Sequence, residues 1–320
     1  MRWANSASAS PTSASTAATT GARSSSTIRG ATASWSPPRA AAEPLAASRR
    51  ICSRRLPAVT DPAQPRLLRA SRAFLVLHGP RILAQKRRLE RDTPRLPDAA
   101  LPWEGKLDGP APLRLLVVGD STAAGTGAPT QNEALPGALA RALQARTGRG
   151  VIWRSVAENG ADTRQFLERH LTDALARPAD LVFVSLGAND ALHARSARAF
   201  ARDLRVLLET LSDRLPQARI LMANLPVFAR FALLPEPTRT TLYRHARNLE
   251  RAAARVIARD PRWMRTEQTP PPYGPDFFAS DLFHPSASGY TDWAVWAVDE
   301  AWSRGLSEIA TTGAETTGAE

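Results

Sequence analysis

The segment LLVVGDSTAAGTG, residues 115–127, decides the fold, because a run of apolar residues ends within it at small and polar ones. The four apolar residues are typical of a buried strand, and Gly119, Asp120 and Ser121 follow where that strand would end. A P-loop would require Gly-Lys-Ser/Thr after the glycines, and a dinucleotide-binding turn would require G-x-G-x-x-G. The segment matches neither motif, so two interpretations stay open: a plain turn or helix start, and an exposed nucleophile at Ser121.

Short apolar runs recur along the chain and alternate with stretches of helical periodicity. The expected strands lie at residues 113–118, 151–156, 181–186 and 220–223. The expected helices lie at residues 133–146, 163–176, 197–214, 240–259 and 287–304. Because strands that alternate with helices at this spacing form parallel sheets covered on both faces, the sequence predicts an α/β fold. Ligands of such folds bind at the carboxyl ends of the strands, so the polar residues at those ends matter most.

Groups suited to acyl transfer follow the expected strands and recur near the C-terminus. They are Ser121, Gly160, Asn189, Asp281 and His284. Each has an ordinary structural explanation. Gly160 would supply a positive φ angle in a loop, Asn189 would cap the next helix, and Asp281 would belong to a turn. These separate explanations do not account for the occurrence of all five groups together.

In their order along the chain, these residues resemble the signature of the SGNH hydrolases, also called GDSL esterases/lipases. The four signature blocks are matched by Gly119-Asp120-Ser121, Gly160, Gly187-Ala-Asn189-Asp190 and Asp281-Leu-Phe-His284. The resemblance covers residues 112–303 and departs from the family's name at Thr122, where the family has Leu. It implies a flavodoxin-like three-layer α/β/α sandwich with a parallel sheet, a Ser-His-Asp triad, and neither a metal nor a cofactor. Asp120 is expected to be structural and to bond neighbouring loops.

The resemblance assigns a role to each residue. A serine hydroxyl is a weak nucleophile unless a nearby base takes its proton, and an imidazole with its unperturbed pKa of ~6.5 is suited to do so. His284 is therefore the expected base for Ser121, and Asp281 would accept a hydrogen bond from the other ring nitrogen. By the resemblance, the backbone N–H groups of Ser121 and Gly160 and the side-chain amide of Asn189 form the oxyanion hole.

The substrate class is less specified. An apolar loop at residues 224–235 follows the fourth expected strand, and its Phe228, Phe231 and Leu233 are candidate lining of an acyl pocket. Ordinary packing beneath the loop is the alternative. An aliphatic ester, a lysophospholipid, a thioester and an acetylated sugar all fit the expected chemistry, so the expected partner is a small-molecule or lipid ester.

The basic charge of the chain is confined to its N-terminal part. The net charge is +12, and the first hundred residues hold 17 Lys and Arg against 5 Asp and Glu, whereas residues 101–320 hold 25 of each sign. A folded nucleic-acid-binding surface would carry its own basic excess, so no nucleic-acid partner is expected. Two other classes stay as alternatives: a membrane or nucleic-acid binder that uses the basic tail, and a non-catalytic relative that binds acyl groups or glycans.

The composition divides the chain into four parts. We expect a low-complexity, disordered segment at 1–65, a basic, partly helical lead-in at 66–108, the hydrolase domain at 109–305 and a flexible tail at 306–320. An over-extended reading frame is the alternative explanation of residues 1–65. For residues 66–91 we expect a solvated helix, and contact with a membrane surface is the alternative.

Two further features concern the cellular setting. Cys52 is the only cysteine, so no disulfide can form within one chain. The apolar run at residues 73–77 is far shorter than the ~20 residues of a membrane span, and Met1 does not open a secretory signal pattern. The expected location is the cytoplasm.

Overall fold

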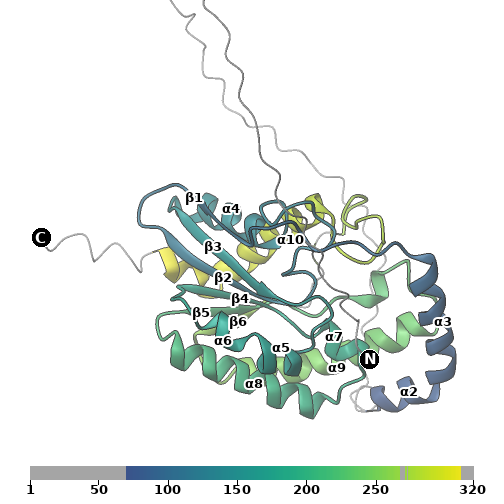
Figure 1. Ribbon diagram of the computed structural model, residues 1–320. Coiled ribbons are helices and arrows are strands. Elements are labelled where there is room, and N and C mark those ends of the chain that lie inside the picture. The colour runs from purple at the N-terminus through teal and green to yellow at the C-terminus, as the bar shows by residue number, and fades with distance from the viewer. Residues whose placement is uncertain (1–69, 267–270, 272, 311–320) are drawn as a thin grey trace, which may run out of the picture. The chain divides into compact units, whose positions relative to one another are not determined.

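A computed structural model of the chain describes residues 70–266, 271 and 273–310. The expectations for residues 1–65 and for Cys52 lie outside the described residues. The described part contains a six-stranded sheet in the order β1-β3-β2-β4-β5-β6, with helices on both of its faces (Figure 1).

The sheet is parallel apart from one edge strand. Its strands are β1 (Glu104–Leu107), β2 (Leu113–Gly119), β3 (Val151–Ala157), β4 (Leu181–Ser185), β5 (Arg219–Met222) and β6 (Trp263–Arg265). Only β1 is antiparallel, and it pairs with β3. Numbered among themselves, the five parallel strands follow the order 2-1-3-4-5, which is that of flavodoxin-like sheets. The expected fold is confirmed; β1 and β6 were not predicted.

Most of the helices fall where their periodicity predicts them. They are α2 (Ser71–Leu77), α3 (Gly79–Asp92), α4 (Leu135–Thr147), α5 (Thr163–Arg169), α6 (Leu171–Ala174), α7 (Ala188–Leu192), α8 (Ala197–Arg214), α9 (Thr238–Ile257) and α10 (Ala287–Trp302). Two 3₁₀ helices are η1 (Phe228–Arg230) and η2 (Leu306–Ala310). The helix expected at 163–176 is divided into α5 and α6 at His170. None of the helices in the described residues is both long and apolar enough to cross a bilayer.

The continuous apolar run of β2 is explained by burial on both faces. Leu115 and Val117 pack with α4 and α10 in one hydrophobic core, while Leu116 and Val118 pack with α8 and α9 in the other. Figure 1 shows the two helical layers on opposite sides of the sheet. Successive side chains of a strand point to opposite faces, so a strand between two helical layers has no polar face.

The carboxyl ends of β2 and β4 meet at the point where the strand order reverses. Gly119 ends β2 opposite Ser185 of β4. A Cβ atom on Gly119 would lie 2.4 Å from the Ser185 carbonyl oxygen, so only glycine allows this close approach. Open α/β sheets bind their ligands at such a switch point, and the polar residues that follow β2 lie there.

The folded domain is larger than the range 109–305 expected from composition. Within the segment expected as a lead-in, β1 belongs to the sheet, and the backbone N–H of buried Ala99 donates to the carbonyl of Ala124. At the other end, Leu306 and Ile309 of η2 are buried in the core. Edge strands with polar faces and short 3₁₀ helices carry little apolar signal, which is why composition placed both boundaries too far inward.

Candidate active site

A serine, a histidine and an aspartate form a chain of hydrogen bonds at the switch point. Ser121 follows β2 directly, and its Oγ lies 3.0 Å from Nε2 of His284. Nδ1 of the same ring lies 2.6 Å from Oδ2 of Asp281. The Ser121 residue is 8% exposed, so its hydroxyl sits at the floor of a depression and not on open surface. These three residues, expected from sequence to act together, are in contact.

The turn from Asp281 to His284 is held by its own carboxylate. Oδ1 of Asp281 accepts hydrogen bonds from the backbone N–H groups of Phe283 and His284, both at 2.9 Å. Leu282 between them adopts a φ of 55°, a left-handed conformation that is uncommon for a non-glycine residue. Burial by itself would raise the pKa of Asp281, but the hydrogen bond and charge of His284, with the two N–H groups, lower it below its usual value. The carboxylate is therefore ionised at neutral pH.

Two backbone N–H groups that were expected to be oxyanion donors have no acceptor within the described part of the chain. Gly160, in the loop after β3, has a φ of 83°, which explains why glycine is found there. The backbone N–H groups of Gly160 and Ser121 donate no hydrogen bond to any described residue.

The third expected donor is engaged elsewhere. The Asn189 side chain, in the first turn of α7, donates through Nδ2 to the carbonyl oxygen of Ala161 at 3.1 Å and to Oδ2 of Asp120 at 3.2 Å. Both bonds are at the long end of the usual range. In this state the two amide protons of Asn189 point to Ala161 and Asp120.

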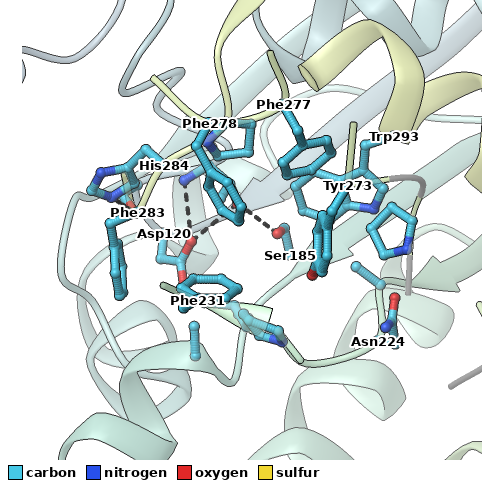
Figure 2. Close-up of a pocket in the computed structure, with 18 residues that line it drawn as sticks. Asp120, Ser185, Asn224, Phe231, Tyr273, Phe277, Phe278, Phe283, His284 and Trp293 are labelled. Atoms are coloured by element: carbon cyan, nitrogen blue, oxygen red, sulfur yellow. Dashed lines mark hydrogen bonds between the residues drawn. The ribbon is translucent and has the colours of Figure 1, made fainter. Parts of the chain in front are cut away.

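Asp120 connects the ends of two strands and a helix, as expected of a structural residue. Its Oδ1 accepts from the backbone N–H and the hydroxyl of Thr122, and that hydroxyl lies 2.6 Å from Oγ of Ser185 (Figure 2). Burial raises the pKa of Asp120 to about 6, against the opposing effect of the Thr122 hydrogen bonds. The network joins β2, β4 and α7 around the nucleophile.

A pocket lined in part by aromatic side chains opens beside Ser121. It encloses about 680 Å³, including solvent-open space at its mouth. Its aromatic lining consists of Phe231, Tyr273, Phe277, Phe278, Phe283 and Trp293 (Figure 2). Of the lining expected from sequence, only Phe231 is present. Phe228 is fully buried behind it, with ring centroids 5.3 Å apart, and Leu233 lies outside the lining.

Most of this lining was not predicted from the sequence, because the expected pocket residues all lie in the loop after β5. The aromatic walls come mainly from the segment just before His284, and α10 adds Trp293. The sequence PDFFASDLF, residues 275–283, has three phenylalanines in nine positions next to the expected base. That density of aromatic residues was the available signal.

An arginine with three carboxylates fixes the loops that carry Gly160 and Asn189. Arg195 Nη1 lies 3.0 Å from Oδ1 of Asp190 and 3.3 Å from Oδ1 of Asp162, and Nη2 contacts Asp203. Asp162 caps α5, just after Gly160, and Asp190 belongs to α7. In the described part of the chain, no group of three or more His, Cys, Asp or Glu side chains is arranged to hold a metal ion.

A second serine–histidine contact has a structural environment. Oγ of Ser71 lies 3.0 Å from Nδ1 of His245, and the other ring nitrogen lies 3.0 Å from the Arg195 carbonyl oxygen. Neither Ser71 nor His245 has exposed surface. Burial lowers the pKa of His245 to about 4, so the ring is neutral. The contact attaches α2 to α9 and offers no path for a substrate.

Comparison with known proteins identifies the family. The GDSL-like Lipase/Acylhydrolase family profile matches residues 117–291, which is more than half of the chain. A GDSL-like esterase from Mycobacterium tuberculosis is 27% identical over 196 residues, which cover 57% of this chain and 59% of that relative.

Solved structures of similar proteins include an esterase from Pseudoalteromonas sp. with 16% identity and a TM-score of 0.46, which covers 61% of this chain and 98% of its own. An acetylxylan esterase from Geobacillus stearothermophilus has 19% identity and a TM-score of 0.44, covering 62% and 96%. From the extent of the profile match, the chain belongs to the GDSL-like lipase/acylhydrolase family.

Proposed function

We propose that the protein is a serine esterase that hydrolyses carboxylic esters through an acyl-enzyme on Ser121. The observation that carries the proposal is the hydrogen-bonded chain Ser121–His284–Asp281, with distances of 3.0 and 2.6 Å. Both lie within the reach required of a nucleophile, its base and the group that orients the base. Membership of the GDSL-like lipase/acylhydrolase family supports the same reaction.

In the proposed mechanism, Nε2 of His284 takes the hydroxyl proton as Ser121 Oγ attacks the ester carbonyl carbon. The imidazolium that forms is stabilised by Asp281, whose lowered pKa keeps it ionised. His284 then gives the proton to the leaving alkoxide as the ester C–O bond breaks. A water molecule, deprotonated by the same ring, then attacks the acyl-enzyme. The bond between the acyl carbon and Ser121 Oγ breaks, the ring returns the proton to Oγ, and the carboxylic acid leaves.

The developing oxyanion requires donors that are already in position. The backbone N–H groups of Ser121 and Gly160, which have no acceptor among the described residues, are the first two in this proposal. Asn189 would be the third, after one of its protons turns from the Ala161 carbonyl or from Asp120 toward the oxyanion. The length of those two hydrogen bonds, 3.1 and 3.2 Å, makes this exchange inexpensive.

The pocket indicates the chemical class of the substrate and not an individual ester. Its aromatic walls favour an ester with an apolar or aromatic substituent beside the scissile bond. A small-molecule ester and the end of a lipid acyl chain both meet this requirement. Contact of residues 66–91 with a membrane is not needed for the proposed reaction.

The experiment is hydrolysis of p-nitrophenyl esters, from acetate to longer acyl chains, by the wild-type chain and by Ser121→Ala. We expect turnover by the wild type and its loss in the variant, with an unchanged circular dichroism spectrum, because the small serine side chain contributes little packing. Ser71→Ala is the matched control and should keep its turnover if it folds. Turnover by Ser121→Ala would refute the proposal. Absence of turnover in the wild type, with binding of the esters, would favour a non-catalytic acyl-binding protein.

A further inference from the structure

Two hydrogen-bond donors in the aromatic pocket have no good acceptor among the residues that the structure describes. Trp293 lines the pocket from α10 and is 8% exposed, and its indole Nε1 has no hydrogen-bond partner within the described residues. Asn224 lines the pocket just after β5 and is also 8% exposed. Among the described residues, its Nδ2 contacts the carbonyl oxygen of the neighbouring Leu225 alone, at 3.4 Å, which is too long for a good hydrogen bond.

The orientation of the Asn224 amide is fixed by Thr266. The backbone N–H of Asn224 donates to the Thr266 hydroxyl at 2.8 Å, and that hydroxyl in turn donates to Asn224 Oδ1 at 2.9 Å. Because the threonine hydroxyl is already an acceptor, its own proton is free for Oδ1, and this assigns the oxygen end of the amide. The Nδ2 amino group of Asn224 is therefore the end of the amide that can donate to a ligand.

The two donors lie well away from the nucleophile. In Figure 2, His284 is at one end of the pocket and Trp293 and Asn224 are toward the other. The strand order agrees, since Ser121 follows β2, Asn224 follows β5, and β4 lies between them. With neighbouring strands about 4.8 Å apart, the donors are roughly 10 Å from Ser121 along the sheet edge.

The charge of the lining decides which acceptor fits. Among the described residues that line the pocket there is no Lys or Arg, and the carboxyl group is that of Asp120. A carboxylate or phosphate would be buried there without a cation, which is costly, whereas a neutral oxygen would receive hydrogen bonds in an apolar setting. A ketone, ether or hydroxyl oxygen meets these conditions.

We propose that Trp293 Nε1 and the Asn224 amide form a subsite for a neutral oxygen acceptor, so that the preferred ester carries such an oxygen on its apolar substituent, remote from the scissile bond. The proposal rests on the esterase function proposed for Ser121. It adds a substrate class to that function: oxygenated apolar esters are selected over plain hydrocarbon ones of the same length.

The test compares esters that differ only in this oxygen. In one series, p-nitrophenyl octanoate is compared with its oxo derivatives, with the ketone placed at successive carbons of the acyl chain. In the other, the acyl group is constant and the alcohol carries the ketone, which distinguishes an acyl pocket from an alcohol pocket. We expect one series to show a ketone position with kcat/KM raised roughly 3- to 10-fold, the effect of one net hydrogen bond.

The variants are compared by the ratio of kcat/KM for the oxo ester to kcat/KM for the plain ester, which is the ketone preference. Trp293→Phe removes the indole N–H and should reduce the ketone preference to about unity, whatever its effect on the plain ester. Trp296→Phe is the matched control, since Trp296 is on the same helix outside the lining, and it should keep the preference. Asn224→Ala is the second variant, in case Trp293→Phe does not fold, and should lower the preference too.

The outcomes separate the subsite from the esterase function. Turnover of plain esters with no ketone preference in either series, or a preference that persists in both Trp293→Phe and Asn224→Ala, overturns the subsite and leaves Ser121 as the nucleophile. If the wild type hydrolyses no ester, the esterase proposal fails, and titration calorimetry with the corresponding oxo-amides then decides the subsite. If the oxo-amide binds and Trp293→Phe weakens its binding, the subsite is supported. Equal binding of oxo and plain amides overturns it.

Discussion

Replacing Glu250 with Gln should remove a large pH dependence of stability. Glu250, on α9, is 4% exposed, and its Oε2 accepts a 2.8 Å hydrogen bond from the backbone N–H of Leu225, next to the pocket residue Asn224. Burial raises the pKa of Glu250 to about 7 from its ordinary 4.5, although the Leu225 N–H and the charges of Arg265 and Arg247 oppose the change.

The size of the effect follows from the two pKa values. Between pH 4.5 and 7 the folded chain holds a proton on Glu250 that the unfolded chain has lost. The stabilisation is therefore complete below pH 4.5, and it is lost as the pH rises through 7. At about 1.4 kcal/mol per pH unit, this interval corresponds to about 3 kcal/mol.

The assay is urea unfolding of the wild type and Glu250→Gln at several pH values. The amide oxygen of Gln can still accept from Leu225, but it does not titrate. The difference in unfolding free energy between the two proteins should move in favour of the variant by about 3 kcal/mol between pH 4.5 and about pH 8.5. All other titrating groups cancel in that difference. Parallel pH profiles of the two proteins would refute the raised pKa and the buried, proton-holding state inferred for Glu250.

Three further changes test the site. Asn189→Ala should lower kcat by about 10²–10³-fold with little change in KM if its amide reaches the oxyanion, whereas a loss of about 1 kcal/mol of stability at constant kcat would show a capping role only. Asp281→Asn should lower kcat by up to about 10⁴-fold, and a variant with the wild-type rate would exclude Asp281 from the triad. Because the pKa of Asp281 is lowered, the wild-type rate should show no titration of this carboxylate between about pH 5 and 9. Asp98 accepts hydrogen bonds from Thr126 Oγ1 at 2.7 Å and Asn159 Nδ2 at 2.8 Å, so Asp98→Ala should loosen the loop before Gly160 and lower kcat. Asp98→Asn keeps an acceptor oxygen and should retain more of the rate. Equal rates in the wild type and both variants would count against this positioning role.

The sequence predicted the parts of the fold whose signal is local. The strands β2 and β4 are buried on both faces, so their apolar runs are visible without any knowledge of the partners. The strand β3 is buried over most of its length and keeps enough apolar residues to be recognised. The edge strand β1 reads EGKL and alternates between exposed and half-buried positions, so its pairing with β3 has no apolar run to reveal it. The five-residue α7 and the three-residue β6 are shorter than any window of periodicity.

The candidate site also has a part that local sequence predicts and a part that it does not. Short motifs identified Ser121, Asp281 and His284, because the spacing of such groups is carried by tight turns within a few residues. The pocket walls depend on how the segment before His284 folds over the end of β5, and hydrophobicity alone does not distinguish a pocket wall from core. Phe228 and Phe231 illustrate this, since one is core and the other is wall in the same loop.

Covalent labelling shows directly whether Ser121 is the activated nucleophile. The intact chain is treated with an alkyl fluorophosphonate, and the modified residue is identified by peptide mass spectrometry while ester hydrolysis is followed in parallel. We expect one phosphonyl group on Ser121, loss of turnover in proportion to labelling, and much slower labelling of His284→Ala. Labelling at another residue, such as Ser71, or full turnover by a chain fully labelled at Ser121, would contradict this assignment.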